Sequence, residues 1–195
     1  MPHATRAFFA RNCNLVAHEL LGAFLTLDGV GGTIVETESY DGEDPASHSY
    51  RMRRTARNAV MFGPPGHAYI YRSYGLHWCL NFVCEVGSAV LIRAIAPEAG
   101  ILKMQERRGP VPLQRLCAGP GRLCQALAVT ELLNGVSVLK PPFSLTIKPT
   151  SATVVLGPRI GISKAKEAPR RFGLQSFPLS KQAILVGPAH WDQRL

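Results

Sequence analysis

The 195-residue chain is poor in acidic residues and has no long hydrophobic run. Its 13 Asp and Glu oppose 22 Lys and Arg, and the resulting formal charge of +9 at pH 7 favours a polyanionic partner such as nucleic acid. No apolar run approaches the roughly 20 residues that a membrane-spanning helix needs, and residues 1–6 lack the apolar stretch of a secretory signal. We therefore expect a cytoplasmic protein, nucleoid-associated if bacterial, with no membrane partner.

Cysteine is scarce, and its spacing does not suit metal or disulfide chemistry. The chain has five cysteines and no C-x-x-C pair: Cys13, Cys79, Cys84, Cys117 and Cys124. An odd number at these spacings fits neither a zinc ribbon nor an iron–sulfur ligand set nor a disulfide framework. We expect buried thiols in a reducing compartment, no metal and no cofactor.

The few acids are gathered between two basic segments. Residues 28–44 hold six of the 13 acids and no base, whereas residues 45–84 contain five arginines and residues 107–130 contain four, with no acid in either segment. A surface without carboxylates suits phosphate binding. This layout is expected where one carboxylate works beside a bound polyanion, and a hydrated acidic loop explains it equally well.

Hydrophobic periodicity and turn residues predict an α+β fold. Helices are expected at residues 14–21, 97–107 and 121–127, and strands at 23–27, 33–40, 68–74, 76–86, 89–95, 144–148, 153–156, 159–162 and 183–186. Loops are expected at 41–67 and, with basic character, before the last strand. Strands and helices do not alternate, so we expect a single domain over residues 1–195, built around a curved antiparallel β-sheet with a protruding β-hairpin and flanking helices.

The strand at residues 33–40 carries two carboxylates and an aromatic ring. Its period of two places Glu36, Glu38 and Tyr40 on one face. Neighbouring carboxylates can serve hydrolysis of a glycosidic bond, in which one carboxylate directs water or stabilises an oxocarbenium-like centre. The alternative is that both glutamates hydrate an exposed sheet face.

Aromatic and histidine side chains follow in the acid-free segment. His48 lies in a polar loop, where it could be a general acid, a stacking platform for a base, or a surface residue without a role. Residues 69–74 would place Tyr69 and Tyr71 on one strand face and Arg72 and Tyr74 on the other. Tyrosines beside arginine suit stacking on nucleobases next to phosphate contacts, although tyrosine is also a common strand filler.

Two further features need polar partners. Arg93 lies in an apolar run at residues 90–94, so it requires a carboxylate, a phosphate or a water molecule, and a structural salt bridge is the simplest case. Residues 119–122 (GPGR) open a predicted helix whose unpaired amides could hold a phosphate, or they form an ordinary turn.

Taken in order, these segments resemble the alkyladenine (3-methyladenine) DNA glycosylase family of base-excision repair. The matching runs are GTIVETESY at 32–40, DPASH at 44–48, TARN at 55–58, MFGPPG at 61–66, YIYRSYGLHWCLN at 69–81, VLIRAIAP at 90–97, GPGRLCQAL at 119–127 and RIGI at 159–162. The chain departs from the family at residues 51–54, which carry bulk where related sequences often have glycine.

The resemblance implies a monofunctional DNA glycosylase that flips a damaged purine out of duplex DNA and hydrolyses its N-glycosidic bond. It makes Glu38 the catalytic base for the attacking water and places Arg93 beside that water and a phosphate, and it gives Glu36 no catalytic role. The residues that would form the base-binding pocket are Tyr40, His48, Tyr71 and Asn81, with Asn81 disfavouring guanine.

Contacts with the DNA stack follow from the same resemblance. Tyr74 would be the wedge that fills the stack after flipping, with Leu76 beside it. From the acid-free basic segments and the helix start at residues 119–122, rather than from the resemblance, phosphate contacts are expected at Arg53, Thr55, Arg57, Gly121 and Arg122. No lysine lies in the matching runs, which favours hydrolysis over lyase chemistry.

The implied partner is double-stranded DNA carrying damaged purines of the 3-methyladenine, hypoxanthine or ethenoadenine type, bound by a monomer. Two other classes stay open on the residues alone. One is a non-catalytic nucleic-acid-binding module that uses the same basic surface, and the other is an RNA or nucleoside hydrolase.

Overall fold

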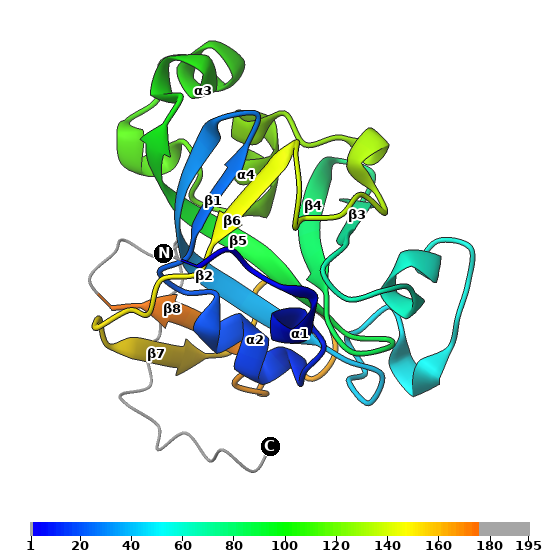
Figure 1. Cartoon of the computed structure of the whole chain (residues 1–195). Helices are drawn as coiled ribbons and strands as arrows, with labels where there is room; N and C mark the ends of the chain where they lie inside the picture. Colours follow the sequence, from blue (N-terminus) through cyan, green and yellow to red (C-terminus); the bar gives the residue numbers. More distant parts are fainter. Residues whose placement is uncertain (1, 176–195) are drawn as a thin grey trace.

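A computed structural model describes residues 2–175 and arranges them around a strongly curved antiparallel β-sheet (Figure 1). The strands are β1 (Phe24–Leu27), β2 (Val30–Tyr40), β3 (Ala68–Ser73), β4 (His77–Val83), β5 (Ala89–Ala99), β6 (Phe143–Thr146), β7 (Val154–Gly157) and β8 (Arg171–Leu174). They are ordered β3-β4-β5-β2-β1-β6, and β8 joins β7 to β2. The α-helices are α1 (Arg6–Phe9), α2 (Cys13–Glu19), α3 (Ile101–Arg108) and α4 (Pro120–Leu127), and 3-10 turns cover Tyr50–Met52, Ala59–Phe62, Leu113–Arg115 and Glu131–Leu133.

Strand β2 is the centre of the sheet and carries the predicted carboxylates. One edge of β2 pairs with β5, and the other edge pairs first with β1 and then with β8. Its register with β5 shifts on both sides of Glu36, and such bulges bend a strand. The close approach of these strands also requires glycine, since a Cβ on Gly32 would lie 1.8 Å from the carbonyl oxygen of Ala96.

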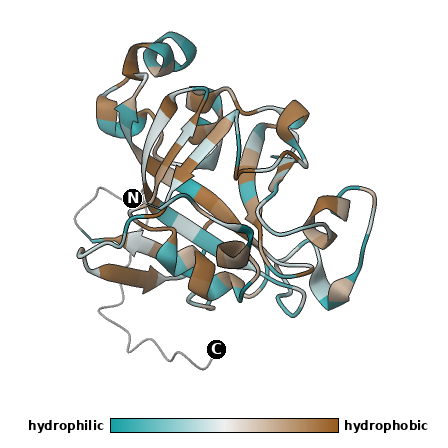
Figure 2. Ribbon diagram, viewed as in Figure 1, coloured by the Kyte–Doolittle hydropathy of each residue, from teal (hydrophilic) through white to brown (hydrophobic). Residues whose placement is uncertain are grey.

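Helices cover the sheet where its side chains are apolar. Helix α2 packs on β2 and β5, and α4 packs on β4 and β5. The largest fully buried side chains come from strands and helices alike and include Phe9, Leu20, Ile34, Phe82 and Phe172. Figure 2 shows hydrophobic residues along β5 and in α2, whereas part of β2 is hydrophilic and the loop that protrudes beside β3 and β4 mixes hydrophilic and hydrophobic residues. Among residues 2–175 no helix has the length and apolar character to cross a membrane.

The predicted α+β class and curved antiparallel sheet are confirmed, but several boundaries differ. The helix expected from Pro97 begins at Ile101, because β5 continues to Ala99 with Pro97 opposite Gly32. Gly100, in the left-handed region at φ +66°, then turns the chain into the helix.

The C-terminal strands were the least predictable. Residues 159–162 form no strand, and the basic segment expected as loop contains β8 instead, which pairs with β7 and β2. Strand β3 ends at Ser73, so Tyr74 lies in the turn of the β3–β4 hairpin. The strand predicted at 183–186 lies outside the described residues.

Candidate active site

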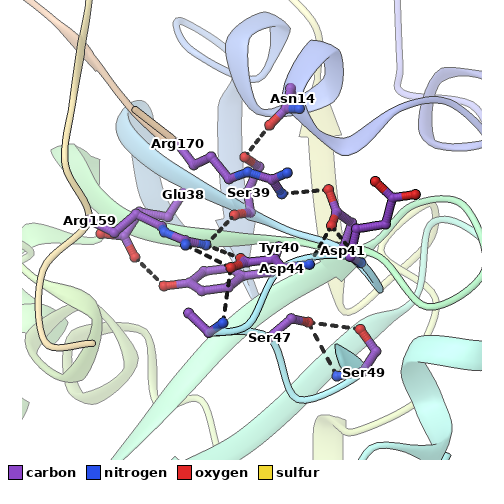
Figure 3. Close-up of polar contacts among 12 residues, drawn as sticks. Asn14, Glu38, Ser39, Tyr40, Asp41, Asp44, Ser47, Ser49, Arg159 and Arg170 are labelled. Atoms are coloured by element: carbon purple, nitrogen blue, oxygen red, sulfur yellow. Dashed lines mark hydrogen bonds and ion pairs between the residues drawn. The ribbon is translucent and has the colours of Figure 1, made fainter. Parts of the chain in front are cut away.

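Glu38 is completely buried near the end of β2, and three donors surround its carboxylate, of which Figure 3 shows Tyr40. The backbone N–H of Ile160 donates to Oε1 at 2.9 Å, and Nη1 of Arg93 lies 3.1 Å from the same oxygen. The Tyr40 hydroxyl donates to Oε2 at 2.6 Å. Because Glu36 is also fully buried, the alternative in which both glutamates hydrate an exposed face is wrong.

Arg93 connects the two glutamates. Its Nε donates to Oε1 of Glu36 at 3.1 Å, and Nη1 of Arg171, on β8, donates to the same oxygen at 3.0 Å. Burial by itself would lower the pKa of Arg93, but the charges of Glu38 and Glu36 raise the pKa above its ordinary value. Arg93 is therefore a buried cation held by carboxylates, one of the partners expected from its apolar run.

A cavity of about 740 Å³ opens beside Tyr40. Its walls come from the loop at residues 45–48, from Arg57, from the β3–β4 hairpin and from residues 161–164. A second cavity of about 30 Å³ shares Tyr40, His48 and Tyr71 with the first and is also lined by Asn81. The structure thus brings together all four residues predicted for the base pocket.

The rings around these cavities are uncharged. The centroid of the His48 ring lies 4.5 Å from that of Tyr71, edge to face, and Nδ1 of His48 is 2.8 Å from the Tyr69 hydroxyl. Partial burial, followed by the charge of Arg57, lowers the pKa of His48. Burial, followed by the Glu38 charge, raises the pKa of Tyr40, which keeps its phenol a hydrogen-bond donor at neutral pH.

The predicted wedge stands at the mouth of the larger cavity. The Tyr74 side chain is 78% exposed, and its hydroxyl donates across the mouth to the carbonyl oxygen of Gly161 at 3.0 Å. Tyr74 has φ +49° and Gly75 φ +69°, so a strained non-glycine residue occupies the hairpin tip. Leu76 is equally exposed but does not line either cavity.

The predicted phosphate contacts fall into two groups. Arg57 lines the cavity, Arg53 is exposed on the same loop, and Thr55 hydrogen-bonds Asn58, which orders that loop. Gly121 and Arg122 lie on α4 and line neither cavity.

The two α4 residues have local contacts of their own. A Cβ on Gly121 would lie 2.7 Å from the His77 ring, and Nη1 of Arg122 donates to the carbonyl of Ala118 at 3.3 Å. A close packing contact therefore accounts for the glycine, and a role of either residue in binding phosphate stays a prediction.

The loop before Thr55 has the backbone conformation of glycine at two of the residues, 51–54, where related sequences often have glycine. Arg51 and Met52 have φ +58° and +55°, in the left-handed region that favours glycine. The Met52 sulfur packs where a Cβ on Gly42 or Gly87 would sit, at 2.3 Å and 3.0 Å from those positions. Met52 therefore packs closely against Gly42 and Gly87 in spite of its left-handed backbone conformation.

Sequence reasoning missed several residues at this site. Arg159 pairs with Asp44, and Lys164 lines the larger cavity; outside both cavities, Arg170 pairs with Asp41. These partners are more than 100 residues apart, so no local pattern could have found them, although Arg159 lies within the matching RIGI run. Lys164 also means that a cavity lysine exists outside the matching runs, and the argument against lyase chemistry loses its basis.

The five cysteines are free and buried, as predicted. Burial raises the pKa of Cys13 to about 12 and that of Cys79 to about 11, so both are thiols at neutral pH. In the part of the chain that the structure describes, no group of three or more His, Cys, Asp or Glu is placed to share a metal ion.

Comparison with known proteins gives one consistent result. The profile of the family described as methylpurine-DNA glycosylase (MPG) matches residues 7–178. A protein of Nitrosospira multiformis named "Putative 3-methyladenine DNA glycosylase" is 58% identical over 166 residues, which are 84% of this chain and 86% of the relative. Proteins of the same name from Rhizobium meliloti (58% over 167 residues, 86% of this chain and 90% of the relative) and Rhodopseudomonas palustris (54% over 177 residues, 89% and 88%) are similar. With its fold, its buried carboxylate and its aromatic cavity, the chain belongs to the methylpurine-DNA glycosylase family and is a DNA glycosylase.

Proposed function

We propose that this enzyme removes alkylated or deaminated purines, of the 3-methyladenine, hypoxanthine and ethenoadenine type, from duplex DNA by hydrolysis with water that Glu38 activates. The observation that carries the proposal is the direct hydrogen bond between Glu38 and Tyr40, a wall of the aromatic cavity. A base bound against Tyr40 would bring its glycosidic bond near the buried carboxylate of Glu38, which contacts this wall. The names of the relatives, which specify 3-methyladenine, support the same substrate class.

Glu38 can accept a hydrogen bond from water without losing its present partners. A carboxylate offers about four acceptor positions, and Ile160, Arg93 and Tyr40 use three. We infer that the remaining position, on the buried Oε2, would accept a hydrogen bond from a water molecule. Glu38 would take a proton from this water as the water attacks C1′ and the C1′–N bond breaks, with the bonding electrons leaving on the cationic purine. Arg93, which stays cationic, would hold the carboxylate and attract the neighbouring phosphate.

The cavity suits an electron-poor purine. Tyr40, Tyr71 and the neutral His48 present aromatic surfaces, and a cationic alkylated base is attracted to such rings. Asn81 lines the smaller cavity with its Nδ2 held by the Tyr69 carbonyl at 2.9 Å. We infer that its bulk there disfavours the exocyclic amine of guanine.

Access to a base in duplex DNA requires flipping, and the mouth of the cavity has the parts for it. Tyr74 and Leu76 project from the hairpin tip, where they would fill the gap in the stack. Exposed Arg53, with Thr55 and Arg57 on the same loop, would contact phosphates, and the enzyme is expected to act as a monomer.

The decisive experiment measures base release from a duplex containing 3-methyladenine by wild type and Glu38→Gln under single-turnover conditions. The variant should lose at least about 1000-fold in rate, since it removes the base for water, and should bind the duplex as wild type does. Glu85→Gln, an exposed glutamate in the β4–β5 turn, is the control and should release base normally.

Each other outcome contradicts a part of the proposal. Wild-type release by Glu38→Gln would exclude the mechanism. A wild-type protein that binds the duplex without releasing base would be a binding module. Strand nicking without added alkali would identify lyase chemistry, and loss of that nicking in Lys164→Met would assign it to the cavity lysine.

A further inference from the structure

Arg159 is a fully buried arginine that contacts three parts of the active-site region (Figure 3). Its Nη2 donates to Oδ1 of Asp44 at 2.9 Å, and its Nη1 pairs with the other oxygen of that carboxylate. Nη1 also donates to the backbone carbonyl of Ser39 at 3.1 Å. The guanidinium carbon lies 4.6 Å from the centroid of the Tyr40 ring.

The guanidinium contacts Tyr40 from the protein interior. The Arg159 side chain has no exposed surface and lines neither cavity, whereas Tyr40 lines both. Within residues 2–175 its Nε is buried without a hydrogen-bond partner. Leaving such a donor unpaired costs about 1–3 kcal/mol, so an orientation that stacks on Tyr40 and pairs with Asp44 is kept in spite of an unsatisfied group.

The covalent neighbours of these groups extend the connection. Ile160, the next residue, donates its backbone N–H to Glu38 at 2.9 Å. Asp44 begins the short segment that carries His48 to the cavity wall, and the Asp44 carboxylate also binds the N–H of Ala46 at 3.0 Å. Arg159 therefore links three groups. It reaches Glu38 through the next residue, Ile160, contacts the Tyr40 ring directly, and connects through Asp44 to the segment that carries His48 to the cavity wall.

We propose that Arg159 is a positioning residue for base excision: it holds the Tyr40 ring and, through Ile160, the Glu38 carboxylate in the geometry that the reaction needs. Asp44 neutralises its charge, so that a cationic base on the cavity side of Tyr40 meets no uncompensated cation behind the ring. This inference rests on the proposed function, because it requires wild-type protein that releases base.

The test compares neutral and conservative variants with a matched control. Arg159→Gln combined with Asp44→Asn leaves no unpaired buried charge, so it is the variant designed to fold. Arg159→Lys keeps the ion pair with Asp44 but lacks the planar group that stacks on Tyr40. Arg170→Gln removes the neighbouring pair with Asp41, which contacts neither Tyr40 nor Glu38 in the contacts described.

Three quantities are measured for each variant: single-turnover release of 3-methyladenine, affinity for a duplex with an abasic-site analogue, and the melting temperature. The double variant should release base about 10-fold to 100-fold more slowly, as expected for a small misplacement of reacting groups, with its affinity for the abasic duplex within about twofold of wild type. Arg159→Lys should recover melting temperature but not rate, and Arg170→Gln should release base within about twofold of wild type.

Other results overturn the inference. A wild-type release rate in the folded double variant would show that Arg159 positions nothing. Full recovery of rate by Arg159→Lys would assign the effect to the ion pair alone. Rate and affinity that fall in parallel with the folded fraction would indicate a structural role, and absence of release by wild type would contradict the proposed function itself.

Discussion

Two groups of arginines in this protein differ in burial and in their pairing with carboxylates. Arg93, Arg159 and Arg171 are at most 5% exposed, and each pairs with a carboxylate: Arg93 with Glu36 and Glu38, Arg159 with Asp44, and Arg171 with Glu36. The arginines of residues 51–57 are exposed on a protruding loop, in a segment without any acid. The buried arginines fix the carboxylates of Glu36, Glu38 and Asp44, and we propose that the exposed arginines contact the phosphates of DNA.

Most acids of residues 28–44 are neutralised by arginines and do not form an exposed acidic surface. Of its six acids, Glu36, Glu38 and Asp44 are buried against arginines, and Asp41 pairs with Arg170. These carboxylates therefore add little negative field at the surface. The basic loop next to them keeps its attraction for phosphates, while Glu38 remains beside the cavity.

Two half-buried arginines of the second basic segment bind backbone carbonyls. Arg107 donates to the carbonyl of Ala126 at 2.8 Å, and Arg108 donates to that of Leu116 at 3.1 Å. Both side chains join α3 to the chain that follows, which accounts for them without DNA. An acid-free segment is thus not by itself a phosphate-binding surface.

The largest expected effect comes from Glu36→Gln, which tests whether the buried ion pairs stabilise the fold more than the exposed ones. This change leaves Arg171 and Arg93 buried with one carboxylate fewer, and losing one partner of a buried pair costs about 3–5 kcal/mol. Chemical denaturation should show this loss in the free energy of unfolding. Arg11→Gln, which removes a half-exposed pair with Glu19, should change that free energy by less than about 1 kcal/mol, and equal effects in the two variants would refute the distinction.

A second prediction concerns the exposed wedge. Tyr74→Ala removes the ring that would stack in the duplex, a contact of about 1–3 kcal/mol, so release of 3-methyladenine from duplex DNA should slow by about 10-fold or more. Tyr74→Phe keeps the ring and removes only the hydrogen bond to Gly161, so it should release base at least as fast as wild type. If Phe were as slow as Ala, the hydroxyl and not the ring would carry the function.

The exposed arginines should act through salt-dependent affinity. Arg53→Ala should weaken duplex binding without changing the maximal release rate, and it should reduce the slope of log affinity against log salt by about 0.9, as for one lost phosphate contact. Titrations at several salt concentrations give this slope. Arg107→Ala should leave the slope unchanged. A smaller slope in this variant would mean that Arg107, in the second basic segment, also contacts DNA phosphates.

The smallest expected effect is a pH dependence from His48. Because its pKa is lowered in the folded protein, the unfolded chain binds more protons below a pH of about 6.5, and stability decreases as the pH falls through this range. His18, whose burial also lowers its pKa, contributes with the same sign. Urea denaturation between pH 7.5 and 5 should show a shallower decrease for His48→Gln, and a steeper one would mean that the folded protein favours the charged ring.

The face of β2 on which the site side chains lie follows from the local sequence alone. Alternation along β2 placed Glu36, Glu38 and Tyr40 together, and the contacts of Arg93 with both glutamates confirm a shared face. Strand period is a property of the backbone, so it can be read without knowing the neighbours. The base pocket residues came from the resemblance to a known family, and all of them line the two cavities.

The burial of the site carboxylates and the identity of their partners depend on the tertiary structure. Whether Glu38 is hydrated or enclosed depends on β8 and on residues 159 and 160, which reach β2 from more than 100 residues away. The same is true of the Asp44 partner and of Lys164 at the cavity mouth. A charged side chain carries no local sign of its partner, because the partner is chosen by how the chain closes on itself and by the cost of leaving a buried charge unpaired.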